Sequence, residues 1–121
     1  MINHKAEAIV ITCIDYRIQE YVNRWISENL EKGTFDRAAF AGGVLNWEMD
    51  LRQIEVAYKL HHIKKVILIN HEDCGVYGEN GQPITHALDL KKASDKIKAL
   101  FSDLEIQTYY LRLDGTFEQV S

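Results

Sequence analysis

Two short apolar runs, residues 8–13 and residues 66–69, constrain the fold of this chain more than any other feature. Both runs are continuous rather than alternating, and both are rich in β-branched side chains. A strand with one face in water alternates apolar and polar residues, whereas a continuous run is typical of a strand buried on both faces of a parallel sheet. We therefore predict two buried parallel strands, over residues 7–13 and residues 66–70.

Apolar residues elsewhere recur at the three- and four-residue spacing of helices. A first helix is predicted over residues 18–30, with Gly33 as its stop signal. Asn46 is predicted to cap a second helix that runs to about His61, and Pro83 suits the first turn of a third helix. The apolar stripe predicted for the third helix consists of Ile84, Leu88, Ile97, Leu100, Phe101 and Leu104.

Two weaker strand candidates, residues 35–41 and residues 106–113, complete an alternation of strands and helices. This order is typical of a three-layer α/β fold, in which a mainly parallel sheet of about four strands carries helices on both faces. The 121 residues have the length of one ordinary domain, so a single domain over residues 1–121 is expected. Ligands of such sheets bind beyond the carboxyl ends of the strands.

The charge and hydropathy of the chain argue against several classes of protein. With a formal net charge of -4 and no basic stripe, the chain is not expected to bind nucleic acid. No apolar run approaches the roughly 20 residues of a membrane helix, and residues 1–5 lead directly into the first strand without a signal peptide. We therefore expect a cytoplasmic protein without a membrane partner, in which the two cysteines stay reduced.

Cysteine and histidine side chains lie where two predicted strands end. Cys13 closes the first strand, and His71 and Cys74 follow the third. Taken singly, each cysteine is more often a small core residue, and the histidine a hydrogen-bonded residue at a strand end. If the two strands are neighbours, one imidazole and two thiolates meet at one edge of the sheet, which is a ligand set that zinc favours. Three protein ligands leave a coordination position open, as in catalytic zinc sites.

The same residues resemble a known family. Residues 13–17, Cys-Ile-Asp-Tyr-Arg, resemble the Cys-x-Asp-x-Arg motif of the β-carbonic anhydrases, and residues 71–75, His-Glu-Asp-Cys-Gly, resemble their His-x-x-Cys-Gly motif. Residues 41–43, Ala-Gly-Gly, are similar to the glycine segment between those motifs, particularly in the short archaeal-type members. The resemblance extends from about residue 8 to residue 78.

This resemblance implies a fold, an activity and a set of site residues. The activity is reversible hydration of carbon dioxide to bicarbonate at a zinc-bound hydroxide, in a homodimer that builds its cleft between subunits. The implied zinc ligands are Cys13, His71 and Cys74. The implied catalytic dyad is Asp15 with Arg17. The glycines implied to line the substrate pocket are Gly42, Gly43 and Gly75.

Asp15 and Arg17 can also be given roles on physical grounds. Zinc lowers the pKa of bound water to near neutrality, although two thiolates should weaken that effect. A carboxylate two residues after a ligand can accept a hydrogen bond from the hydroxide and relay its proton, and an arginine can keep that carboxylate ionised and aimed. Two alternatives stay open: Asp15 as a fourth zinc ligand, as in a resting form of the family, or a solvated Asp15 beside an ordinary arginine. Glu72 and Asp73 are expected to be solvated loop residues or to support the ligands.

The chain also departs from the family pattern. Ala39 and Phe40 replace the Arg-Asn pair that usually precedes the glycine segment, so an interaction expected near the dyad is missing. Asn70 stands where a small residue, often glycine, precedes the histidine, which could alter the contacts behind the site. Tyr77 could line the cleft, and His86 could shuttle protons, although no neighbouring residue in the sequence supports that role.

Three other functions compete with the carbonic anhydrase prediction. A phosphatase-like or rhodanese-like enzyme would use Cys13 as nucleophile and Arg17 as anion clamp, but the turn between them is too short and carries an acid. A hydrolase of carbon disulfide or carbonyl sulfide on the same scaffold is a more serious alternative, because fold and metal do not determine the substrate. The third possibility is a zinc-binding module without turnover.

Overall fold

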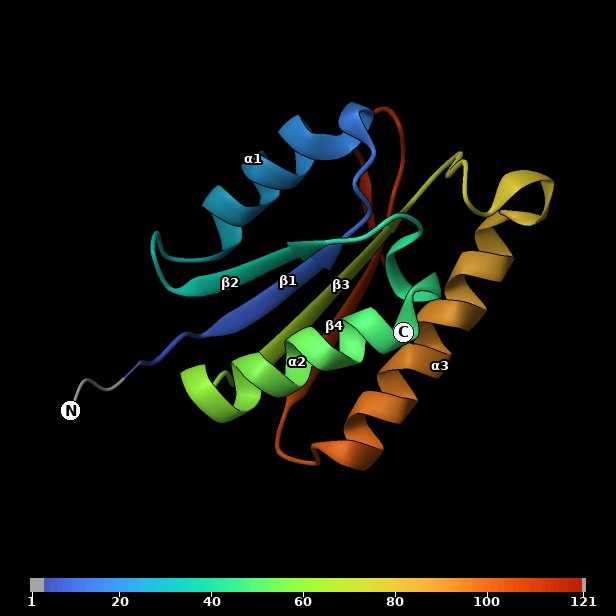
Figure 1. Ribbon diagram of the computed structural model, residues 1–121. Coiled ribbons are helices and arrows are strands. Elements are labelled where there is room, and N and C mark those ends of the chain that lie inside the picture. Colours follow the sequence, from blue (N-terminus) through green and yellow to red (C-terminus); the bar gives the residue numbers. More distant parts are fainter. Residues whose placement is uncertain (1–3, 121) are drawn as a thin grey trace.

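The computed structural model of the protein describes residues 4–120 and contains one five-stranded sheet (Figure 1). The strand order is β2-β1-β3-β4-β5, in which the first four strands are parallel and β5 runs antiparallel to β4. The predicted mainly parallel sheet is confirmed, but it has five strands rather than about four. The strands are β1 (Ala8–Thr12), β2 (Phe35–Ala39), β3 (Lys65–His71), β4 (Glu105–Leu111) and β5 (Phe117–Val120).

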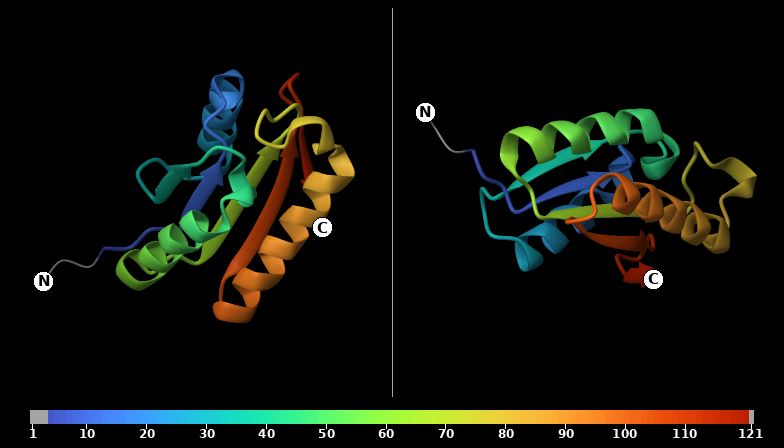
Figure 2. Two further views of the ribbon diagram at one scale, coloured as in Figure 1. Left: turned by 45° about the vertical axis from the view of Figure 1, so that its right-hand side comes forward. Right: turned by 90° about the horizontal axis from the view of Figure 1, so that it is seen from below.

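Three α-helices cover the two faces of this sheet, which gives the predicted three layers (Figure 2). Helix α1 packs on one face, and α2 and α3 pack together on the other. Short 3-10 turns precede α1, α2 and α3. The helices are α1 (Gln19–Asn29), α2 (Trp47–His61) and α3 (Pro83–Leu100), and the turns are η1 (Tyr16–Ile18), η2 (Gly43–Leu45) and η3 (Gly78–Asn80).

Strand β1 explains why the apolar runs are continuous. All of its residues are buried, and successive side chains enter opposite layers: Val10 packs in the core beneath α1, whereas Ile9 and Ile11 pack in the core beneath α2 and α3. Strand β3 divides its side chains between the same two cores. Because side chains alternate along a strand, a strand covered on both faces needs apolar residues at every position.

The central strands also bring the sequence motifs together. Strands β1 and β3 are direct neighbours in parallel register, with Ile11 opposite Leu68. The chain therefore leaves both strands at the same edge of the sheet, immediately after Thr12 in one case and after His71 in the other. The assumption that the first and third strands are neighbours, on which the predicted metal site depended, is thus confirmed.

The buried face of α3 differs from the predicted apolar stripe. Ile84, Leu88 and Leu100 are 65%, 64% and 58% exposed, so this part of the stripe was wrong. Ile97 is buried as predicted, and the other core-facing residues of the helix are His86, Leu90 and Ala93. Both sets have helical spacing, and the buried set looked weaker in the sequence because it includes a histidine and a small alanine.

Three local predictions also needed correction. Strand β5 was missed because its two central residues are polar and exposed, and it forms because a turn at Gly115 brings the chain back beside β4. Asn46 occupies the N-cap position of α2, but its side chain makes no capping hydrogen bond. Strand β2 ends at Ala39, before the glycine turn begins, rather than at residue 41.

The helices of the described part of the chain are not suited to crossing a membrane, since none is both long and apolar enough. The prediction about a signal peptide falls partly on residues 1–3, which lie outside the described residues.

Two leucines on α3 test which face of this helix is buried. Leu90 is 0% exposed, so Leu90→Ala is expected to lower the free energy of unfolding by about 2–5 kcal/mol through the cavity it leaves. Leu88 is 64% exposed, and Leu88→Ala is expected to change that free energy by less than about 0.5 kcal/mol. Urea unfolding followed by circular dichroism measures both variants. Equal effects would contradict the orientation described above.

Candidate metal centre

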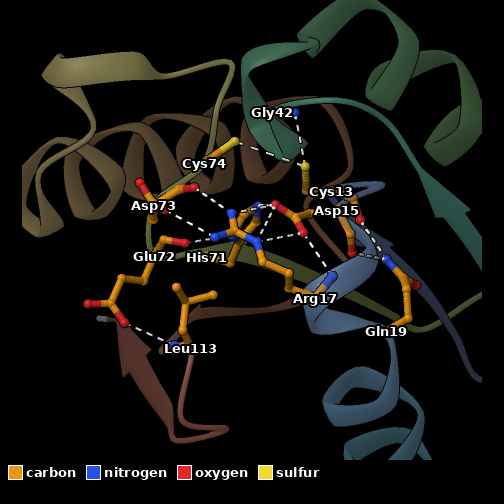
Figure 3. A network of polar contacts seen from close by, with 10 residues as sticks. All are labelled: Cys13, Asp15, Arg17, Gln19, Gly42, His71, Glu72, Asp73, Cys74 and Leu113. Atoms are coloured by element: carbon orange, nitrogen blue, oxygen red, sulfur yellow. Dashed lines mark hydrogen bonds and ion pairs between the residues drawn. The ribbon is translucent and has the colours of Figure 1, made fainter.

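Cys13, His71 and Cys74 come together at the carboxyl edge of the sheet (Figure 3). All three are buried, and their ligand atoms lie within 4.8 Å of one another. The two sulfur atoms are 4.0 Å apart, and both cysteines are free thiols. A tetrahedral zinc ion with Zn–S bonds of about 2.3 Å would separate two thiolates by about 3.8 Å. The spacing of the thiols therefore fits a zinc ion.

The hydrogen bonds of His71 leave one ring nitrogen unused. Its Nδ1 lies 2.8 Å from the carbonyl oxygen of Glu72, and because a carbonyl only accepts, Nδ1 carries the proton and donates it. Its Nε2 is buried and has no hydrogen-bond partner. A buried imidazole nitrogen without a partner is unfavourable unless something else binds it. A backbone carbonyl that orients the far nitrogen is also the usual arrangement behind a metal-binding histidine.

The thiol of Cys13 is activated by its surroundings. Burial alone would raise the pKa of this thiol, but the neighbouring His71 ring and a hydrogen bond from the Gly42 amide outweigh it and lower the pKa to about 7. The Gly42 amide nitrogen lies 3.3 Å from the Cys13 sulfur. Burial raises the pKa of Cys74 instead. One of the two thiols is therefore prepared to lose its proton near neutral pH, and a thiolate is the form that binds metal.

Asp15 and Arg17 form a close ion pair beside these three residues. The Arg17 side chain donates from Nη2 to Asp15 Oδ2 at 2.8 Å and from Nε to Oδ1 at 3.1 Å, and its backbone amide donates to Oδ1 at 2.8 Å. These bonds lower the pKa of Asp15 to about 2. Asp15 Oδ2 lies 3.8 Å from His71 Nε2. The carboxylate is thus ionised and faces the unused nitrogen of the candidate metal centre.

The predicted pocket glycines occupy different environments. Gly42 and Gly43 lie in the turn before α2 with positive φ angles of 86° and 57°, which favour glycine. A Cβ atom on Gly43 would lie only 2.4 Å from Asn70 Oδ1, so the turn packs directly against that side chain. Gly75 is exposed and has open space where a Cβ would be. Their role in lining a substrate pocket stays a prediction.

His86 and Tyr77 have partners that the sequence did not reveal. His86 is 0% exposed, and its Nδ1 lies 2.9 Å from Asn70 Nδ2. The Tyr77 hydroxyl is bonded to both Asn70 and Asp89. The fold gives His86 hydrogen-bonding neighbours that the sequence did not predict, and its part in proton transfer stays a prediction. These four residues lie within residues 70–89 but follow no recognisable motif, so only the fold reveals their contacts.

Comparison with known families identifies the chain. Residues 3–121 match the sequence family described as "Putative carbonic anhydrase". The chain belongs to this carbonic anhydrase family. The resemblance to β-carbonic anhydrases that the motifs predicted is thereby confirmed.

This member of the carbonic anhydrase family is also similar to other proteins in sequence and in structure. An uncharacterized protein of Rickettsia conorii is 26% identical over 136 residues, covering 97% of this chain and 73% of the relative. A carbonic anhydrase from Glaciozyma antarctica gives a TM-score of 0.75 at 15% identity, covering 100% of this chain and 85% of that one. The apo form of a carbon disulfide hydrolase gives 0.70 at 14% identity, covering 99% and 81%. The TM-scores demonstrate a common fold, and identities this low leave the substrate open.

In this carbonic anhydrase family member, Arg17 is also held from the loop after β3. Its Nη1 donates to Asp73 Oδ2 at 3.0 Å, and its Nη2 donates to the Asp73 carbonyl oxygen at 2.8 Å (Figure 3). Asp73 has a positive φ of 58°, which turns its carbonyl toward the arginine side chain. The general expectation that Asp73 supports the site agrees with these contacts, but its specific link to Arg17 was not predicted.

The ion pair can be tested through the pKa of Asp15. In Arg17→Gln this pKa is expected to rise from about 2 toward the usual value of 3.8, because the charge-assisted bonds are lost. In the wild type, the pair stabilises the fold above pH 3.8, and this stabilisation is lost as the pH falls through about 2. Carbon-13 NMR titration of the metal-free protein measures both forms. An unchanged Asp15 pKa in the variant would contradict the pairing.

Proposed function

We propose that this protein is a zinc-dependent carbonic anhydrase that catalyses the reversible hydration of carbon dioxide to bicarbonate, with Cys13, His71 and Cys74 as its zinc ligands. The observation that carries this proposal is the buried, unpartnered Nε2 of His71, which shares a 4.8 Å cluster with two free thiols. Membership of a carbonic anhydrase family supports the choice of reaction. The donor set, one imidazole and two thiolates, supports zinc over a hard cation such as magnesium.

Zinc bound to these ligands would supply a Lewis acid that makes a water molecule acidic enough to react near neutral pH. The chain contributes the groups that direct this water. Ionised Asp15 would accept a hydrogen bond from this water and so orient the oxygen lone pair toward the carbon atom of carbon dioxide. Because the pKa of Asp15 is about 2, the carboxylate does not retain the released proton at neutral pH, and the proton passes on to solvent.

Arg17 is the positioning partner in this proposal. It occupies both oxygens of Asp15, which supports an arrangement with Asp15 beside the metal rather than bound to it. Its contacts with Asp73 hold the guanidinium in one orientation. Removing Arg17 is therefore expected to slow the reaction more than it weakens metal binding.

A second candidate function is hydrolysis of carbon disulfide or carbonyl sulfide. It is favoured by the TM-score of 0.70 with a carbon disulfide hydrolase, a value close to the 0.75 obtained with a carbonic anhydrase. A zinc-binding module without turnover is the third candidate, because Ala39 and Phe40 replace the pair that usually supports the dyad.

We also propose that the protein is a cytoplasmic homodimer. Three exposed apolar side chains lie on the loops that carry the site residues: Ile14, Tyr16 and Val76 are 60%, 86% and 56% exposed. Exposed apolar side chains on these loops favour burial against a second subunit, as the resemblance to β-carbonic anhydrases implies. The cytoplasmic location is supported by the two free thiols, which need a reducing compartment when no metal protects them.

The activity is tested by zinc analysis together with stopped-flow measurement of carbon dioxide hydration. About one zinc per chain and measurable hydration are expected for the wild type. Asp15→Asn is expected to retain zinc and to lose roughly 100-fold or more in kcat, since an amide is a poor proton acceptor. Asp103→Asn, at an exposed carboxylate that bonds Tyr58, is the matched control and should keep full activity. Zinc binding without hydration, combined with turnover of carbon disulfide, would favour the second candidate, and absence of zinc would overturn the site.

The dimer is tested by sedimentation velocity. The wild type is expected to sediment at twice the chain mass of 14.0 kDa. Val76→Asp should shift it to the monomer, because it buries a charge in the subunit contact. Leu60→Asp is the control, since Leu60 is 61% exposed but lies in the last turn of α2, away from the site loops. A monomeric wild type would contradict the proposal.

A further inference from the structure

Asn70, the residue before His71 at the end of β3, uses its whole side-chain amide in buried hydrogen bonds. Its Oδ1 accepts a hydrogen bond from the Val44 amide at 3.2 Å. Its Nδ2 donates to the Tyr77 hydroxyl at 2.9 Å and to His86 Nδ1 at 2.9 Å. The residue is 1% exposed. A buried amide is costly unless its bonds are made, so this amide depends on all three partners being in place.

The directions of these bonds are determined by the chemistry of the partners. Tyr77 accepts from Asn70 and donates its own proton to Asp89 Oδ2 at 2.9 Å. His86 must accept at Nδ1, because the Asn70 nitrogen can only donate. Burial lowers the pKa of His86 to about 4, which keeps the ring neutral and able to accept. The network therefore has a single consistent pattern of donors and acceptors near neutral pH.

Asn70 is linked to the segment of each candidate ligand, once through the chain and twice through its hydrogen-bond partners. His71 follows Asn70 directly in the chain. Val44 belongs to the same turn as Gly42, whose amide donates to the Cys13 sulfur at 3.3 Å. Tyr77 donates its backbone amide to the Cys74 carbonyl oxygen at 3.1 Å. One side chain thus joins the segments that hold all three ligands.

Asn70 and the glycine turn are in such close contact that no side chain fits at position 43. A Cβ atom on Gly43 would lie 2.4 Å from Asn70 Oδ1, well inside van der Waals contact. The turn and the amide therefore position each other, and a change at either one must move the other.

We propose that Asn70 is a positioning residue of the metal centre, which holds the three ligand segments in their binding geometry before the metal arrives. The inference rests on the proposed zinc site and goes beyond it, because Asn70 itself contacts no ligand atom in that proposal. A site arranged in advance loses less conformational freedom on binding, so it binds more tightly than a site that the metal must assemble. Groups behind metal ligands commonly contribute roughly 10–100-fold to metal affinity.

Three variants disturb the network from different sides. Asn70→Ala removes the amide, Tyr77→Phe removes one hydroxyl and keeps the ring, and Gly43→Ala forces a Cβ against the amide. Two matched controls make the same chemical changes elsewhere. Tyr58→Phe removes a hydroxyl that also bonds a carboxylate, that of Asp103, and Gly33→Ala places a Cβ at a positive φ of 77° with nothing within 4 Å.

The experiment measures zinc affinity by chelator competition, the visible spectrum of the cobalt-substituted protein, and thermal unfolding of the metal-free protein. Asn70→Ala is expected to weaken zinc binding roughly 10–100-fold and to alter the cobalt spectrum, which reports ligand geometry. Tyr77→Phe and Gly43→Ala should also weaken zinc binding and alter the cobalt spectrum. Neither control variant should change the zinc affinity or the spectrum. Adding Asn70→Ala to Gly43→Ala should weaken binding little further, because both act through one contact.

Two results would overturn the proposal. If the network variants lower only the unfolding temperature and leave zinc affinity and the cobalt spectrum as in the wild type, Asn70 is a packing residue and the zinc site stands without it. If the wild type itself binds no zinc, the zinc site and this inference fail together. Should Asn70→Ala not fold, Tyr77→Phe decides between these outcomes, because it removes a single oxygen atom.

Discussion

The structure depends on the pairing of two parallel strands that are buried on both faces. Because β1 and β3 are parallel neighbours in the middle of the sheet, the chain leaves both strands at the same edge. Cys13 is the first residue after β1, and Cys74 lies three residues after the end of β3. The candidate metal centre is therefore a consequence of the sheet topology, as expected for ligand sites in open α/β sheets.

The buried polar groups at this edge of the sheet differ in how many hydrogen-bond partners they have. Asp15 and Asn70 are saturated with partners, whereas His71 Nε2 is buried without one. Asp50 and His86 also carry buried side-chain atoms without partners among the described residues, but only the His71 atom belongs to a cluster with two thiols. Burial raises the pKa of Asp50 to about 7, so that carboxyl can avoid a buried charge by staying protonated. His71 Nε2 differs from these atoms in lying beside two thiols and the Asp15 carboxylate, which is a set of groups that fits a metal ion.

The parts of the fold that were predicted correctly are those with strong local signals. Continuous β-branched runs identified β1 and β3, and helical spacing with Gly33 and Pro83 located α1 and α3. The buried face of α3 was mistaken because tertiary contacts bury His86 and expose Leu88, against the hydropathy of the two residues. The residues of the candidate metal centre and Asp15 could be named because they lie in short motifs. The Asn70 network could not, since its members are brought together only by the packing of β3, the glycine turn and α3.

The contacts around Arg17 show how the chain holds the Asp15–Arg17 ion pair without the Arg-Asn pair that usually precedes the glycine segment in β-carbonic anhydrases. Ala39 and Phe40 offer no polar side chain there, so Arg17 cannot be held from that side. Asp73 binds the guanidinium from the opposite loop, through both its carboxylate and its carbonyl oxygen. Asp73 sits between His71 and Cys74 in the chain, so any movement of the ligand loop also moves Arg17 and, through it, Asp15. The Asp15–Arg17 pair and the loop from His71 to Cys74 are therefore linked by direct contacts. In the proposal above, Asn70 positions the same loop from its buried side.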